Sequence, residues 1–192
     1  MRRTTTLLTL TTCLLLTGAT TGCSSDTDDK PTVSKATHTP SADASSPSPT
    51  PSPSPETYKL GDTIDIETSG YQFAVTVIAF ADKGITSVPG LLKAGEKWAQ
   101  VEVKVCNTGS EALGVSPFPW SLAYADGVRV EATSVSGAEL PGPEYPVEAR
   151  VRGGDCVRGK VPFEVPEGGR AERVLYSPGD LDEPVEWVLP KG

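Results

Sequence analysis

The residues with the most distinctive chemistry in this 192-residue chain are its four cysteines. A thiolate can act as a nucleophile, bind a metal or exchange with a disulfide, so the surroundings of each thiol decide its chemistry. Cys23 stands between an apolar segment and the acidic, hydroxyl-rich stretch SSDTDD. Such a boundary is where exported chains are processed.

The N-terminal segment MRRTTTLLTLTTCLLLTGATTGC has the composition of an export signal. Arg2 and Arg3 precede an apolar run from Leu7 to Leu16. That run spans about 10 residues, whereas a membrane-spanning helix needs about 20. The pattern predicts a lipoprotein signal peptide over residues 1–22, which is removed on export.

The signal ends in TTGC, with small residues before Cys23, and this ending resembles the lipobox of bacterial lipoproteins. In those signals the cysteine sulfur takes a diacylglyceryl group, and cleavage leaves the modified cysteine as the new N-terminus. We therefore expect lipidation of Cys23 and anchoring at the outer face of the cell membrane, because two acyl chains suffice for stable attachment. Thr20 departs from the pattern, which usually has an aliphatic residue there. The alternative is ordinary cleavage and a free thiol at Cys23.

Cys106 and Cys156 are left once Cys13 has departed with the signal and Cys23 carries lipid. Two cysteines in an oxidising compartment have a single way to pair, so we expect a Cys106–Cys156 disulfide rather than two free buried thiols. A zinc site is not expected, because the only histidine, His38, lies in a low-complexity segment.

Other reactive constellations are weak. Hydrolytic triads need a base, usually histidine, and the predicted folded region has none. The acidic group Asp180, Asp182 and Glu183 has oxygen ligands suited to calcium, but a solvated acidic turn is the favoured interpretation. Carboxylates converging from different strands leave a carboxylate-dependent hydrolase as a minor alternative. We therefore expect no catalytic residue, no metal and no cofactor.

Residues 23–57 are predicted to be the lipidated cysteine followed by a disordered tether. The stretch from residue 24 contains seven prolines and no aromatic residue, so it cannot bury enough apolar surface to offset the entropy of ordering. From Tyr58 onward the composition changes, because every aromatic residue of the chain lies there.

Period-two alternation dominates residues 58–192 and predicts strands. The stretch WAQVEVKVC alternates valines with polar residues, YQFAVTVIAF places its apolar residues on two faces, and FPWSLAY places its large residues on one. The residues expected to share faces are Tyr71, Phe73, Val75 and Val77, opposite Ile78 and Phe80, and separately Phe118, Trp120, Leu122 and Tyr124. Seven or eight short strands between Gly- and Pro-rich turns predict an all-β, immunoglobulin-like antiparallel β-sandwich.

The two cysteines of this domain fall in the polar phases of their strands. If the strands are antiparallel neighbours with Cys106 opposite Cys156, then Val105 meets Val157 and Val101 meets Val161 on the buried face. The disulfide would then clamp two adjacent strands on their outer surface. An antibody disulfide differs, because it crosses the core between two sheets.

Charge and loop composition suggest where partners would bind. Loss of the two signal arginines takes the formal charge from −8 to −10, which disfavours nucleic acid and leaves membrane association to the lipid. A local basic stripe is a candidate contact for an anionic wall polymer, although an ordinary charged strand face is favoured: Arg150, Arg152, Arg158 and Lys160. Two Gly- and Pro-rich loops supply apolar candidates for binding, although capping of the core is favoured: Leu91, Leu92, Leu140 and Tyr145.

Four segments together resemble a bacterial family of unknown function: KLGDTIDI, GEKWAQVEVKVCNTGSEALGVSPFPWSLAYADG, GGDCVRGKVPFEVPEGG and VEWVL. Its members are immunoglobulin-like domains on secreted lipoproteins, similar in fold to mycobacterial secreted immunogenic antigens, and the family has carried the label telomeric repeat-binding factor two. The most specific pieces are Asn107 with Gly109, Asp126 with Gly127, and GKVPFEVP at 159–166. The resemblance implies a fold and an extracytoplasmic address, and no reaction.

Two functions fit these observations. The first is a membrane-anchored extracytoplasmic lipoprotein that presents a β-sandwich interaction module to a protein or cell-wall ligand. The second is a structural component of the envelope, or an accessory subunit or inhibitor. Neither predicts an oligomeric state.

Overall fold

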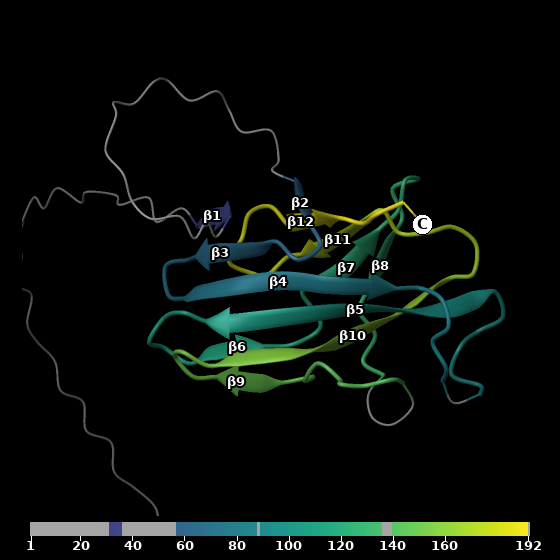
Figure 1. Ribbon diagram of the computed structural model, residues 1–192, viewed down its shortest axis with the longest axis horizontal. Coiled ribbons are helices and arrows are strands. Elements are labelled where there is room, and N and C mark those ends of the chain that lie inside the picture. The colour runs from purple at the N-terminus through teal and green to yellow at the C-terminus, as the bar shows by residue number, and fades with distance from the viewer. Residues whose placement is uncertain (1–30, 36–56, 88, 136–139, 192) are drawn as a thin grey trace, which may run out of the picture.

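The computed structural model describes residues 31–35, 57–87, 89–135 and 140–191. Within these ranges the chain forms twelve strands in three sheets (Figure 1). The predicted signal peptide, Cys23 and most of the predicted tether lie outside the described residues. No helix in these ranges is long and apolar enough to cross a membrane.

Two five-stranded sheets make up the sandwich, and a small third sheet flanks them. Sheet A has the spatial order β1 (Thr32–Lys35), β3 (Thr63–Glu67), β4 (Gln72–Ala81), β5 (Glu96–Asn107), β10 (Cys156–Pro166). Sheet B has the order β2 (Thr57–Lys59), β12 (Val185–Val188), β11 (Arg173–Tyr176), β7 (Trp120–Ala123), β8 (Arg129–Glu131). The third sheet pairs β6 (Leu113–Val115) with β9 (Ala149–Val151).

The predicted all-β sandwich is confirmed, and its core lies between the two large sheets. In β5 the odd-numbered residues from Ala99 to Val105 are fully buried, because alternate side chains of a strand point to one face. Trp120 and Trp187 fill the same core from sheet B, with ring centroids 6.1 Å apart. In Figure 1 the strands of sheet A lie in front of β7, β8 and β11.

The predicted register of β5 and β10 is confirmed. Cys106 pairs with Cys156, Val105 with Val157, and the ladder continues to Glu96 opposite Pro166. The disulfide joins these neighbouring strands, with 4.0 Å between the two Cα atoms, and both cysteines lie on the outer face of sheet A. Closing a loop with a sequence separation of 50 stabilises the fold by about 4 kcal/mol in the chain-entropy model.

Strand number and direction differ from the prediction. The prediction lacked four of the twelve strands described, each of three or four residues: β1, β2, β6 and β9. The pair β2 and β12 is parallel rather than antiparallel.

The face predicted for Phe80 is wrong, and a β-bulge is the cause. The register of β4 against β5 shifts between Val77 and Ala79, so Phe80 lies opposite the inward-facing Val101 and packs against the core. An extra residue in one strand reverses the phase of every residue after it.

Two aromatic residues predicted to share a strand face with residues that are buried are themselves exposed. Tyr71 is 40% exposed and Phe118 is 55% exposed. Tyr71 precedes the first residue of β4 and Phe118 lies in the loop before β7, so neither belongs to the pleated strand that its alternation suggested.

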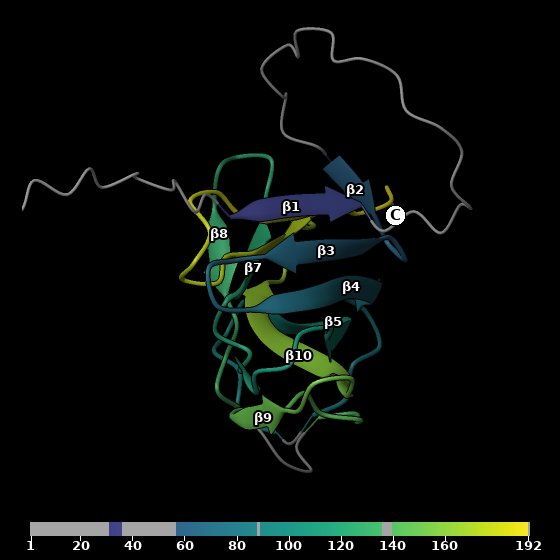
Figure 2. The same cartoon turned by 90° about the vertical axis from the view of Figure 1, so that its left-hand side faces the viewer.

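The tether prediction is wrong for residues 32–35. They form β1, which pairs antiparallel with β3 at the edge of sheet A, as Figure 2 shows. Four residues give no composition signal, but the exposed edge of β3 offers them backbone hydrogen-bond partners.

The free edge of β10 is covered by the loop that leads into β9. The Tyr145 N–H donates to the Lys160 carbonyl, and the Lys160 N–H donates to the Pro143 carbonyl. The loop can approach β10 this closely because residue 159 is glycine: a Cβ there would lie 2.5 Å from the Glu144 carbonyl oxygen. The loop thereby delivers Tyr145 to the core.

We predict that Gly159→Ala destabilises the protein by about 1–3 kcal/mol, because the added methyl group forces the covering loop off β10. Gly114→Ala is the matched control, since that strand glycine has open space around its Cβ position. Equilibrium unfolding in guanidinium chloride measures both. Equal unfolding midpoints for the two variants would contradict the packing argument.

Candidate functional site

An apolar groove runs beside the edge of sheet B, where β2 meets the last residues of the chain. Its volume is about 450 Å³, and its lining comes from β2, the residue after it, and the end of β12: Thr57, Tyr58, Lys59, Leu60, Val188, Leu189 and Pro190. Val188 is 42% exposed although it lies on a strand. An exposed apolar side chain within a groove is a common feature of binding surfaces.

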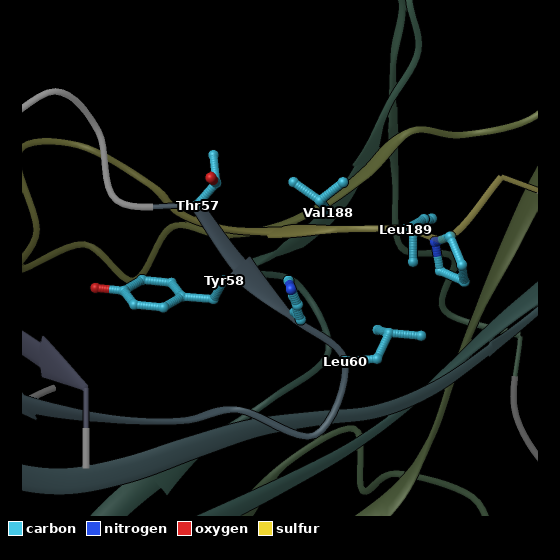
Figure 3. A pocket seen from close by; sticks show the side chains of 7 residues that line it. Thr57, Tyr58, Leu60, Val188 and Leu189 are labelled. Atoms are coloured by element: carbon cyan, nitrogen blue, oxygen red, sulfur yellow. The ribbon is translucent and has the colours of Figure 1, made fainter. Parts of the chain in front are cut away.

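The floor of the groove is rigid, because its buried residues belong to the core. Tyr58 packs against Trp187 with ring centroids 6.1 Å apart, and Leu189 is also buried. In Figure 3 the Tyr58 ring points away from the groove, whereas Leu60, Val188 and Leu189 gather along one side of β2. β2 ends the strand order of sheet B among the described residues, and the groove lies between β2 and the end of β12, its paired neighbour.

A second hollow, of about 330 Å³, is polar and lies between the β3–β4 turn and the loop after β5. It includes Glu67, Tyr71, Gln72 and Glu111. Its Gln72 amide already donates to Glu67 at 2.9 Å. The apolar groove is larger and contains the exposed Val188, so it is the better candidate for an interaction surface.

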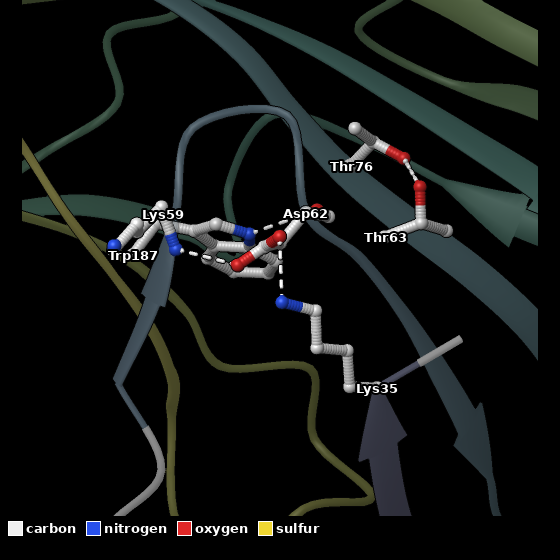
Figure 4. Close-up of polar contacts among 6 residues, drawn as sticks. All are labelled: Lys35, Lys59, Asp62, Thr63, Thr76 and Trp187. Atoms are coloured by element: carbon white, nitrogen blue, oxygen red, sulfur yellow. Dashed lines mark hydrogen bonds and ion pairs between the residues drawn. The ribbon is translucent and has the colours of Figure 1, made fainter. Parts of the chain in front are cut away.

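Asp62 connects both sheets with the N-terminal strand near this groove (Figure 4). Its carboxylate accepts the Lys59 backbone N–H at 2.9 Å and pairs with the Lys35 ammonium at 2.8 Å. Its backbone carbonyl accepts the buried Trp187 indole N–H at 3.3 Å. The turn from β2 into β3 is thus held from β1, β2 and β12 at once.

The hydrogen bond from Lys35 and that from the Lys59 backbone lower the pKa of the Asp62 carboxyl below its ordinary value of 3.8. A lowered pKa in the paired state means that the carboxylate stabilises the docked β1 above about pH 3.8. That stabilisation is lost as the pH falls through the lowered pKa.

We predict that acidification below pH 3.8 releases β1 before the sandwich unfolds. The NMR methyl signals of Val33 report docking of β1, and those of the fully buried Val75 report the core. Lys35→Gln should remove this acid-dependent step, whereas Lys83→Gln, at an exposed site, should keep it. A Val33 titration unchanged by Lys35→Gln would show that Asp62 does not hold β1.

The apolar residues predicted to bind are dispersed. Leu91 is 37% exposed and Leu92 is half-buried in the β4–β5 connection, whereas Leu140 is half-buried beside β10. For Tyr145 the structure supports capping of the core instead of binding, because the side chain is 2% exposed and belongs to the core. Burial raises the pKa of its hydroxyl, with a smaller contribution from Tyr176.

The predicted basic stripe is divided between two sheets. Arg150 lies on β9 and Arg152 follows it, whereas Arg158 and Lys160 lie on β10. The Arg158 guanidinium pairs with Glu102 at 2.8 Å, diagonally across the β5–β10 ladder. This charge is therefore partly neutralised.

A buried ion-pair cluster around Asp82 is structural. The Asp82 carboxylate accepts hydrogen bonds from the Lys97 ammonium at 3.2 Å and from the Arg170 guanidinium at 2.6 Å. The same guanidinium lies 5.0 Å from the Phe80 ring centroid. The contacts bring the ends of β4 and β5 to the β10–β11 connection. Among the described residues, no group of three or more potential ligands could hold a metal ion.

Sequence reasoning missed the groove and the Asp62 junction. Both lie where segments distant in the chain meet, since β2 and β12 are at opposite ends of the domain sequence. The exposed Val188 within the alternating VEWV stretch was the one local signal.

The fold defines this chain as an all-β sandwich protein with a disulfide inside one sheet. It belongs to the family described as domain of unknown function DUF4352, whose profile matches residues 58–185. A search of curated proteins finds no significant match.

Several solved structures are similar. The secreted protein MPT63 of Mycobacterium tuberculosis is 20% identical over 72% of this chain and 100% of its own, with a TM-score of 0.57. The yjhA protein of Bacillus subtilis is 15% identical over 69% and 99%, with a TM-score of 0.49. An uncharacterized beta-sandwich protein of Clostridium difficile is 8% identical over 73% and 100%, with a TM-score of 0.45. At these identities the likeness establishes the fold alone.

Proposed function

We propose that this protein is an extracytoplasmic lipoprotein, anchored through Cys23, whose β-sandwich binds an extended segment of a partner protein in the groove beside β2. The observation that carries the binding half is the apolar groove beside the outermost strand of sheet B. The proposed location outside the cytoplasm comes from the sequence of the predicted signal peptide.

Two features support export. The Cys106–Cys156 disulfide lies on the outer face of sheet A, where a reducing cytosol would have access to it. The fold is compatible with export, because the structurally similar MPT63 is a secreted protein. The net negative charge of the chain argues against a nucleic-acid partner, although the family that the sequence resembles has carried the label telomeric repeat-binding factor two.

The groove suits an extended segment, whose alternate side chains can enter apolar pockets. The Thr57 and Lys59 side chains are exposed and that of Tyr58 is buried. The Lys59 N–H and carbonyl are already bonded to Asp62, so side-chain contacts in the groove, rather than hydrogen bonds to the β2 edge, would hold the segment. Leu60 and Val188 supply apolar surface for alternate side chains of the added segment.

We predict that the mature N-terminal peptide carries the lipid on Cys23 and that the protein fractionates with membranes. Cys23→Ser should release the domain or leave the signal uncleaved, whereas Cys13→Ser should change neither. Mass spectrometry of the N-terminal peptide is the measurement. An intact start, or a bare thiol at Cys23, would overturn the anchor.

We predict that Val188→Glu abolishes capture of a partner by the groove, because the carboxylate would have to be desolvated on binding. Val128→Glu is the matched control, since Val128 is 44% exposed at the β7–β8 turn, at the other edge of sheet B. Crosslinking in intact envelopes followed by quantitative mass spectrometry compares the partners retained. A partner lost equally from both variants, or from neither, would exclude the groove.

A further inference from the structure

β1 is held to the domain by one short edge contact. Among the strands of the described ranges it pairs with β3 alone, through four residue pairs from Thr32–Glu67 to Lys35–Ile64. Three of its four side chains are exposed, and Val33 is the one that packs against the core. The remaining side-chain contact is the ion pair from Lys35, 52% exposed, to Asp62.

These contacts make β1 the most easily detached strand of sheet A. Exposed ion pairs stabilise little, and a half-buried valine contributes far less than the fully buried valines of β5. Removing β1 leaves the ladder of β3 with β4 intact, together with the disulfide-linked β5 and β10. Such peripheral elements open locally without global unfolding.

The position of β1 in the chain gives its detachment a consequence. Residues 24–31 separate it from Cys23, and residues 36–56 separate it from β2. At about 3.3–3.6 Å per residue, the first segment reaches at most about 28 Å, and residues 24–56 together reach at most about 115 Å.

We propose that the edge of β3 is a docking site for the chain's own segment Thr32–Lys35, and that its occupancy sets how far the domain can move from its membrane anchor. With β1 docked, the leash is residues 24–31. With β1 released, it is residues 24–56. The leash depends on the lipid anchor proposed above, whereas the docking itself does not.

The covalent connection of residues 36–56 makes this docking intramolecular. Partners joined by a short linker have an effective concentration in the ~mM range. Weak contacts of the kind seen at β1 are then enough to keep the segment docked, and a modest pull or a competing strand is enough to release it. Once β1 is released, the β3 edge presents unpaired backbone groups to solvent.

Single-molecule force measurements on the mature chain test the docking without lipid. The Cys23 thiol serves as one handle, because Cys106 and Cys156 are paired, and the C-terminus carries the other. We expect a reversible low-force step, before unfolding of the sandwich, that releases a contour length of about 85 Å from residues 32–56.

Two variants make the step specific. Val33→Asp should lower the ratio of docked to released molecules by about tenfold or more, because it places a carboxylate against the core. Thr32→Asn adds a polar side chain of the same size at an exposed position of β1, without a like charge opposite Glu67, and should keep the step. Ser34→Cys with Asp65→Cys locks directly opposed residues and should abolish the step until reductant is added.

The leash is tested with lipidated full-length protein in phosphatidylglycerol vesicles, by energy transfer from a dye on the domain to a headgroup dye. The locked variant should show high transfer and Val33→Asp low transfer. Absence of the force step in the native sequence, or its persistence in Val33→Asp, overturns the docking. A normal force step with equal transfer in both variants overturns the leash alone. Loss of the anchor itself appears separately, as an unmodified Cys23 peptide.

Discussion

The pairing of β5 with β10 is the constraint on which the rest of the structure depends. Eleven consecutive residue pairs from Cys156–Cys106 to Pro166–Glu96 fix which face of each strand is buried, because a shift of one residue would expose every inward valine. The disulfide holds one end of this ladder, and sheet A grows outward from it through β4 and β3. The core that sheet B completes with Trp120 and Trp187 presupposes that register.

The remaining architecture consists largely of ways to treat sheet edges. An unpaired edge is a liability in water and an opportunity for a partner. At β10 the edge is closed by the loop through Pro143 and Tyr145, which approaches so closely that only Gly159 fits beneath it. At β3 it is closed by the short, mostly exposed β1. At β2 no further strand lies among the described residues, the Asp62 turn bonds the Lys59 backbone, and the apolar groove lies between β2 and the end of β12.

These edges differ in permanence, and that difference gives the domain its proposed behaviour. The covering of β10 delivers a buried tyrosine to the core, so it belongs to the cooperative fold. The covering of β3 depends on one half-buried valine and an exposed ion pair to Asp62. Because Asp62 also accepts the Trp187 indole, the junction that holds β1 is itself fixed, while its occupant is not. A rigid docking site with a weakly held occupant is what an adjustable attachment requires.

The sequence alone determined the fold class, the disulfide and the β5–β10 register, since strand alternation and the phase of two cysteines are local properties. It also predicts the signal peptide and its lipidated cysteine, which lie outside the described residues. The tertiary structure decided the rest. The bulge after Val77 reversed the face of Phe80, and close backbone approach explains Gly159. The groove, the Asp62 junction and β1 arise where segments distant in sequence meet, and a pattern read along the chain cannot detect a contact made across it.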